Sequence, residues 1–164
     1  MKTSMNWLRQ YTEIPQDCEL FQQKMIMTGT AVESIQDLGA QIDGVVVGRV
    51  QSCVKHENSD HLHVCQVDVG GESLLQIVCG APNVKEGILV PTALVGAKLP
   101  GGFEIKQSKL RGVDSSGMLC SSTELNVPQE LYPSVGEAGL LILNEDYPLG
   151  SDVKLIFGLD DSVV

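Results

Sequence analysis

Residues 44–54 read Gly-Val-Val-Val-Gly-Arg-Val-Gln-Ser-Cys-Val, and they begin a series of short apolar runs that decides the fold. Glycine, asparagine and proline separate the runs, as expected of strands joined by turns. The five expected strands are Val45–Val54, Leu62–Val69, Ser73–Cys79, Ile88–Val95 and Phe103–Leu110. Because no long helix lies between them, the sequence predicts a mainly β (α+β) protein built on a small antiparallel barrel.

The natural candidate for residues 41–126 is the OB-fold, a five-stranded barrel. Residues 1–40 form a helix-helix-strand segment before it, in which Ser4 caps one helix, Asp17 begins a second and Gly29 ends it. Residues 127–164 are expected as a C-terminal extension that packs on the barrel and returns to the N-terminal segment. Because Gly158–Val164 resemble the start of a strand, we expect the chain to be truncated here.

The formal net charge of −10 is unfavourable for nucleic-acid binding, but the charge is unevenly spread. Residues 125–164 carry 1 basic and 7 acidic side chains, whereas residues 41–124 carry 7 and 9. Within residues 98–111 only Glu104 opposes four cations, which are Lys98, Lys106, Lys109 and Arg111. Such a group can contact RNA phosphates, although an ordinary solvated strand face would have the same composition.

The last expected strand explains how these cations would share one face. Phe103, Ile105 and Leu110 can all be core residues only if the strand shifts register near residues 107–108, as a bulge would allow. That shift would turn Lys106, Lys109 and Arg111 outward together.

A second candidate RNA contact is the loop from His56 to His61. His56, Asn58 and His61 have side chains suited to phosphate or base contacts, while Asn58, Ser59 and Asp60 are also ordinary turn formers. The loop is therefore either an RNA contact or a structural hairpin.

Other chemistry has little support in the sequence. The three histidines and five cysteines lack the close Cys pairs or regular spacing of zinc sites, and no nucleophile motif or phosphate-binding glycine loop is present. Scattered cysteines in apolar surroundings indicate buried, reduced thiols. No apolar run approaches the ~20 residues of a membrane span, and no signal peptide is recognisable, so we expect a cytoplasmic protein without membrane partners.

Aromatic residues are scarce between residues 44 and 126, where Phe103 is the only one. Proteins that bind single strands generally stack bases on several aromatic rings. General single-strand or DNA binding is therefore not expected. Recognition of a folded RNA through its shape and phosphates stays open as an alternative.

Several short motifs occur in a fixed order along the chain, and together they resemble a known family. The runs at residues 56–62, 64–70, 76–84, 96–102 and 110–121 together resemble the tRNA-binding OB domain of aminoacyl-tRNA synthetases and their accessory proteins. Residues 4–11 and 27–33 resemble the opening of the bacterial phenylalanyl-tRNA synthetase beta subunit. The family usually has proline at Glu57 and lysine at His61, so this chain lacks a rigid loop residue and a permanent cation there.

The resemblance implies a fragment of an α2β2 ligase that uses ATP and magnesium to join phenylalanine to its tRNA. The implied partners are tRNA, the rest of the beta subunit and the alpha subunit. No catalytic or metal-binding residue of the family falls within this chain, which would act as an auxiliary tRNA-binding and packing module. Two alternatives stay open: a free-standing dimeric tRNA-binding protein, and a chaperone-like module that binds proteins.

Overall fold

Two compact units make up the described part of the chain. The structure is a computed structural model and describes residues 1–131 and 139–164. One unit contains Met1–Ala40 and Lys154–Val164, and the other contains Gln41–Val153. The expected three-part division, with boundaries after residues 40 and 126, stays a prediction.

The first unit is held together by capped helices and a short sheet. The Ser4 side chain accepts a hydrogen bond from the Trp7 backbone N at 2.9 Å, as expected of a cap. Asp17 caps the second helix, and Gly29, with φ of 89°, follows its end. The elements are α1 (Met5–Arg9), α2 (Cys18–Met27) and an antiparallel pair of β1 (Gln36–Asp37) and β10 (Ser162–Val163).

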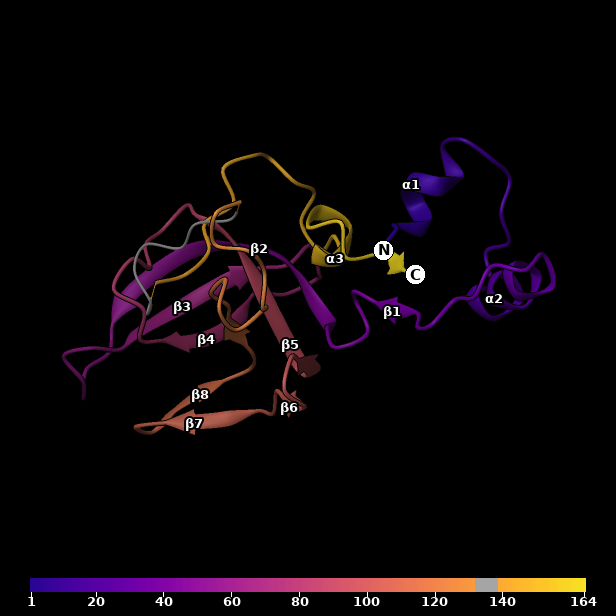
Figure 1. Cartoon of the computed structure of the whole chain (residues 1–164). Coiled ribbons are helices and arrows are strands. Elements are labelled where there is room, and N and C mark those ends of the chain that lie inside the picture. Colours follow the sequence, from indigo (N-terminus) through magenta and orange to yellow (C-terminus); the bar gives the residue numbers. More distant parts are fainter. Residues whose placement is uncertain (132–138) are drawn as a thin grey trace. The chain divides into compact units, whose positions relative to one another are not determined.

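The second unit is a curled antiparallel sheet centred on β2 (Asp43–Lys55), as Figure 1 shows. On one side β2 pairs with β3 (His63–Asp68), which pairs with β4 (Leu75–Cys79). On its other side β2 pairs with β5 (Leu89–Leu99), which also pairs with β9 (Met118–Leu119). Three strands in a meander, followed by a fourth that returns to the first, give the topology expected of an OB-fold, and the predicted fold class is confirmed.

The segment before β9 closes the barrel against the free edge of β4. The Ser116 backbone N donates to Gln76 O at 2.8 Å, and the Val78 backbone N donates to Ser115 Oγ at 3.1 Å. Gly117 makes this approach possible, since its φ is 146° and a Cβ there would lie 2.6 Å from Ala93 O. The β4 edge is thereby covered.

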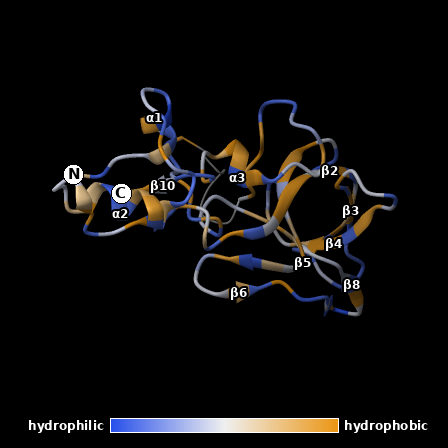
Figure 2. Ribbon diagram, turned by 90° about the vertical axis from the view of Figure 1, so that its right-hand side faces the viewer, coloured by the Kyte–Doolittle hydropathy of each residue, from blue (hydrophilic) through white to orange (hydrophobic). Residues whose placement is uncertain are grey.

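The core fills the barrel between these strands. Inward residues alternate with outward ones along β3, where Cys65 and Val67 are buried and Val64 and Gln66 are half-buried. Figure 2 shows apolar residues concentrated on the strands of this unit and polar ones on its loops. Fully buried side chains at the centre include Val47, Val50, Ile77 and Val90. This packing fixes the positions from which the loops extend.

The fifth expected strand, Phe103–Leu110, is wrong. The chain forms β6 (Phe103–Glu104) beside β5, and then β7 (Ser108–Leu110) pairs with β8 (Val113–Ser115) in a separate hairpin. Arg111 and Gly112 form its two-residue loop with φ of 47° and 86°, the type I′ geometry that matches strand twist. Ile105 is buried as expected, but Phe103 and Leu110 are 59% and 39% exposed, so neither is a core residue.

Residues 139–153 run along the barrel. The Leu143 backbone N donates to Leu89 O at 2.8 Å, and the Val47 backbone N donates to Ser151 O at 2.9 Å. The short helix α3 (Val153–Ile156) follows. No helix in the described residues is long and apolar enough to span a membrane.

Candidate nucleic-acid interface

The β7–β8 hairpin brings two of the predicted cations to the surface. Lys109 and Arg111 are exposed, and Arg111 occupies the first position of the tight turn. A type I′ turn requires positive φ at both central residues, and arginine adopts this conformation less readily than glycine, asparagine or aspartate. The hairpin therefore presents a guanidinium group at its tip, at a small conformational cost.

The loop after β2 supports this hairpin through a buried histidine. His56 is 3% exposed, and its Nδ1 accepts from the Asn58 backbone N at 3.0 Å. Because Nδ1 is an acceptor, the ring proton sits on Nε2, which donates to Leu110 O at 3.2 Å. Arg111 Nη1 also donates to Asn58 O, at 3.3 Å. Loop and hairpin are thus joined by two hydrogen bonds, and His56 presents no free ring nitrogen to a phosphate.

A groove of about 410 Å³ lies where the loop, the hairpin and the outer face of the β2–β3 pair meet. Lys55 lines it beside Glu57 and Asn58, and Val113 contributes the hairpin wall. Lys55 was missed by the sequence reasoning, although its place at the end of the long β2 strand, just before the His56 loop, could have indicated it. The other lining residues are Ser52, Val54, His56, Val64 and Gln66.

Acidic side chains reduce the positive charge of this region. Lys109 Nζ lies 3.7 Å from Asp114 Oδ1 across the hairpin, and Lys55 Nζ lies 3.5 Å from Asp60 Oδ1. Both pairs are exposed, so each is weak and readily exchanged for another partner. Arg111 contacts a backbone carbonyl rather than a carboxylate, and it is the hairpin cation best placed to meet a phosphate.

The remaining predicted contacts do not line the groove. Lys98 is in β5 directly opposite Glu104 of β6, and Lys106 follows β6 and lines a different pocket. His61 is exposed in the His56 loop, where its backbone N donates to Ser59 Oγ at 3.3 Å. The four predicted cations therefore do not form one strand face. Lys98 lies in β5 and Lys106 follows β6, whereas Lys109 and Arg111 belong to the β7–β8 hairpin.

The cysteines form no metal site with the histidines. All five are free thiols, and in the described residues no three His, Cys, Asp or Glu side chains are placed to hold a metal ion. Cys65, Cys79 and Cys120 are buried in the barrel, and burial raises the pKa of each thiol. Burial therefore favours the protonated, less reactive form of each thiol.

Comparison with known proteins accounts for the barrel and its loops together. The family described as "Putative tRNA binding domain" matches residues 45–152, which include the groove, the hairpin and every predicted contact residue. The chain belongs to this tRNA-binding domain family. The resemblance inferred from the ordered motifs is confirmed.

Curated relatives of this chain are longer proteins. The chain is 47% identical over 163 residues to the phenylalanine–tRNA ligase beta subunit of Aromatoleum aromaticum, and 48% identical over 166 residues to that of Trichormus variabilis. The matches cover 99% and 100% of this chain, respectively, but only 20% of each relative. The chain thus spans about a fifth of the length of the curated relatives it matches.

Among solved structures, the MetRS related protein from Pyrococcus horikoshii is similar at 22% identity. The match covers 65% of this chain and 85% of that chain, with a TM-score of 0.45. This likeness is too weak to add to the family assignment.

Proposed function

We propose that this chain is an auxiliary tRNA-binding module of a phenylalanine–tRNA ligase beta subunit. The observation that carries the proposal is the family match over residues 45–152, in which the hairpin and the His56 loop are joined around one groove. The two relatives compared above match 99% and 100% of this chain, and both are beta subunits of this ligase.

The proposed contact is with RNA phosphates at the hairpin and groove. Arg111 and Lys109 from the hairpin, and Lys55 and Asn58 from the loop side, supply the donors. Asp60 and Asp114 oppose them, so the binding is weak and depends on salt. Contacts of this kind position an RNA without reading its sequence, which suits a module that assists a larger tRNA-binding enzyme.

The proposed setting is the complete ligase in the cytoplasm. Its partners would be tRNA, the rest of the beta subunit and the alpha subunit, with no role for DNA or membranes. A ligase of this class uses ATP and magnesium. The described residues offer no cluster to hold such a metal ion, so we place no step of that chemistry among them.

The experiment compares two double substitutions that remove the same charge. Lys109→Ala/Arg111→Ala removes the hairpin cations, and Lys85→Ala/Lys98→Ala removes two exposed cations elsewhere on the barrel unit. Fluorescence anisotropy with labelled tRNA would be measured at about 50 and 200 mM salt, a range over which phosphate contacts lose much of their affinity. We expect wild-type binding that weakens with salt, and a larger loss for the hairpin variant.

Two results would contradict the proposal. Absence of tRNA binding at low salt would favour the reading of the barrel as a protein-interaction module. Equal losses of tRNA affinity in the two double variants would show that binding depends on general surface charge and not on the hairpin.

A further inference from the structure

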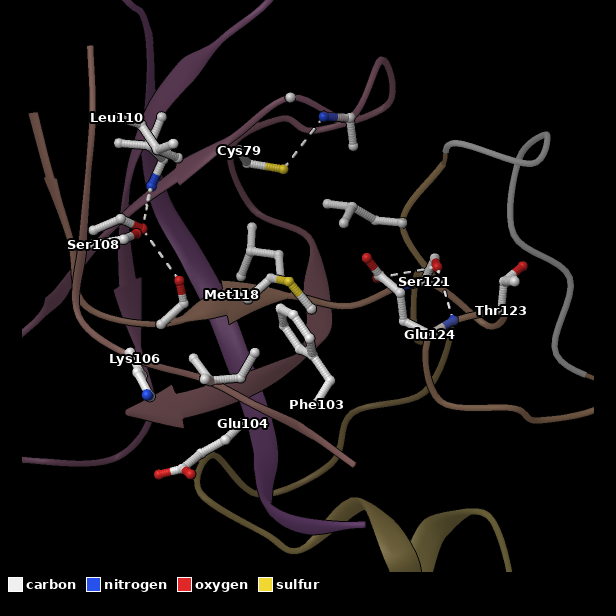
Figure 3. Close-up of a pocket in the computed structure, with 18 residues that line it drawn as sticks. Cys79, Phe103, Glu104, Lys106, Ser108, Leu110, Met118, Ser121, Thr123 and Glu124 are labelled. Carbon is white, nitrogen blue, oxygen red and sulfur yellow. Dashed lines mark hydrogen bonds between the residues drawn. The ribbon is translucent and has the colours of Figure 1, made fainter. Parts of the chain in front are cut away.

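A second, larger hollow opens beside the β7–β8 hairpin. It has a volume of about 590 Å³ and is shown in Figure 3. Its walls come from the end of β4, the β6 segment, the hairpin, β9 and the turn at residues 121–124. All of these lie within the barrel unit and within the family match. The groove described above shares the hairpin with this pocket but none of its lining residues.

Apolar side chains left open to solvent form one part of the lining. Phe103 is 59% exposed and Leu110 is 39% exposed, while Met118 is half-buried. Figure 3 shows Phe103 and Met118 next to each other in the middle of the lining. An exposed aromatic ring in a hollow offers a flat surface on which another ring can stack.

Polar atoms occupy one side of the same pocket. Glu124 Oε2 accepts from the Ser121 backbone N at 2.7 Å and from Ser121 Oγ at 3.1 Å, which fixes the carboxylate. The hydrogen bonds found in the described residues leave Glu124 Oε1 as an acceptor. Thr123 lies beside it in Figure 3, and Lys106 lies on the opposite side.

The charges of the lining select against an anion inside the pocket. Lys106 is the one cation among the described lining residues, and it is opposed by Glu104 and Glu124. A phosphate would meet a net negative surface there, whereas an uncharged ring that carries N–H donors would satisfy the Glu124 carboxylate. Lys106, at the other side, remains available to a phosphate outside.

We propose that this pocket receives a single unpaired guanine base of an RNA bound at the neighbouring hairpin. The base stacks on Phe103 and Met118 and directs its N1–H and N2–H donors at Glu124, with its own phosphate near Lys106. The inference rests on the proposed tRNA function and deepens it, because it adds one base contact to binding that is otherwise through phosphates.

Guanine fits this lining better than the other bases. Its Watson–Crick edge carries two adjacent N–H donors, which a carboxylate and its neighbouring hydroxyl oxygen can accept together. Uracil offers one donor between two carbonyl acceptors, and these carbonyls would face the Glu124 carboxylate. Phe103 is the one aromatic among the described lining residues, which suits one base rather than a run of bases.

The test is an NMR titration of the 164-residue chain with guanosine 5′-monophosphate at millimolar concentrations. We expect shifts of the Met118 methyl and Phe103 ring signals, at least about fivefold weaker binding for Phe103→Ala, and no change for the control Tyr11→Ala. Tyr11 is 72% exposed and belongs to the other unit. Glu124→Gln is expected to remove the preference for guanosine over uridine monophosphate while leaving stacking in place.

Several outcomes would overturn the base assignment. The first is no shift of the Met118 and Phe103 signals. The second is an equal shift with ribose 5-phosphate, which would indicate a phosphate site. The third is an equal shift with N-acetyl-leucinamide, which would indicate a pocket for apolar peptide side chains. Failure of the wider function is recognised separately. If tRNA binding depends on Lys109 and Arg111 but guanosine monophosphate leaves the pocket unchanged, the base site is wrong and the tRNA function stands. If guanosine monophosphate binds in the pocket but tRNA does not bind, the pocket is a nucleotide site and the proposed tRNA function is wrong.

Discussion

The β7–β8 hairpin and the barrel that carries it differ in how deeply their side chains are buried and in what holds them in place. In β5 the first five residues are all buried, whereas all three residues of β7 are exposed. The barrel is held by packing around side chains such as Ile77 and Val90, both 0% exposed. The hairpin is joined to its neighbours by a few hydrogen bonds, among them those from His56 and Arg111.

This difference separates stability from recognition. Removing atoms from a well-packed core lowers the free energy of unfolding, whereas side chains on an exposed hairpin can be changed with little effect on it. Substitutions in the barrel should therefore act on unfolding, and substitutions in the hairpin should act on RNA binding.

The largest effect is expected from the barrel substitution Ile77→Ala. Ile77 is fully buried, and removing its side chain leaves a cavity that costs about 2–5 kcal/mol of the free energy of unfolding. Urea unfolding followed by circular dichroism measures the loss, with Leu74→Ala, at a 47% exposed position, as control. The contrast breaks if Leu110→Ala in the hairpin is as destabilising as Ile77→Ala.

The barrel thiols should be protected until the unit unfolds. Burial raises the pKa of Cys65 and Cys120, so at pH 8 the reactive thiolate fraction of each is far below that of an ordinary cysteine. A disulfide-exchange reagent should first modify the half-buried Cys18 and Cys53, and the buried thiols only in denaturant. Mass spectrometry of the modified peptides gives the order, and early modification of Cys65 would show that the barrel opens locally.

Arg111→Asn should weaken RNA binding without harming the fold. Asparagine suits the type I′ turn better than arginine, so the gain in turn preference offsets the lost bond to Asn58 O. We expect unfolding to change by less than about 0.5 kcal/mol, the usual range for surface positions. The tRNA affinity should fall several-fold, as measured by anisotropy at low salt. A stability loss comparable to a core substitution would show that the guanidinium group is structural.

The smallest effect is expected from Asp114→Asn. This change frees Lys109 from an exposed ion pair worth at most about 1 kcal/mol and removes one negative charge beside the groove. Binding of tRNA should become about two- to threefold tighter, and more steeply dependent on salt, because one more cation is available to phosphates. Asp68→Asn removes the same charge at the C-terminal end of β3, outside the groove lining, and is the matched control. Weaker binding by Asp114→Asn would mean that the ion pair holds Lys109 in place.

Local signals predicted much of the fold. Ser4 and Asp17 cap their helices as expected, because capping depends on hydrogen bonds to residues two or three positions away. The first four strands were located to within a few residues by their turns and β-branched residues. The family was recognisable from the order of motifs alone.

The candidate site was predicted less well because it depends on pairing rather than on local sequence. The apolar pattern predicts one strand over residues 103–110, whereas in the structure the Arg111-Gly112 turn pairs β7 with residues downstream. A single strand predicts that the cations share one face, but Lys98 and Lys106 lie outside the hairpin that carries Lys109 and Arg111. Asp114 and Asp60 come near the cations only in the folded chain, so the charge balance of the groove was not readable from the sequence.

The pairing of β1 with β10 has a consequence for the order in which the chain is made. Asp37 pairs with Ser162, and the Thr3 backbone N donates to Val164 O at 2.8 Å, so the first unit needs residues from both sides of the barrel. During synthesis, β1 leaves the ribosome before the whole barrel and must wait unpaired until β10 follows. The barrel, whose strands all lie between these two, is complete first. The folded barrel holds its two ends together, since the Val47 backbone N donates to Ser151 O. This shortens the loop between β1 and β10 and lowers the entropy cost of their pairing.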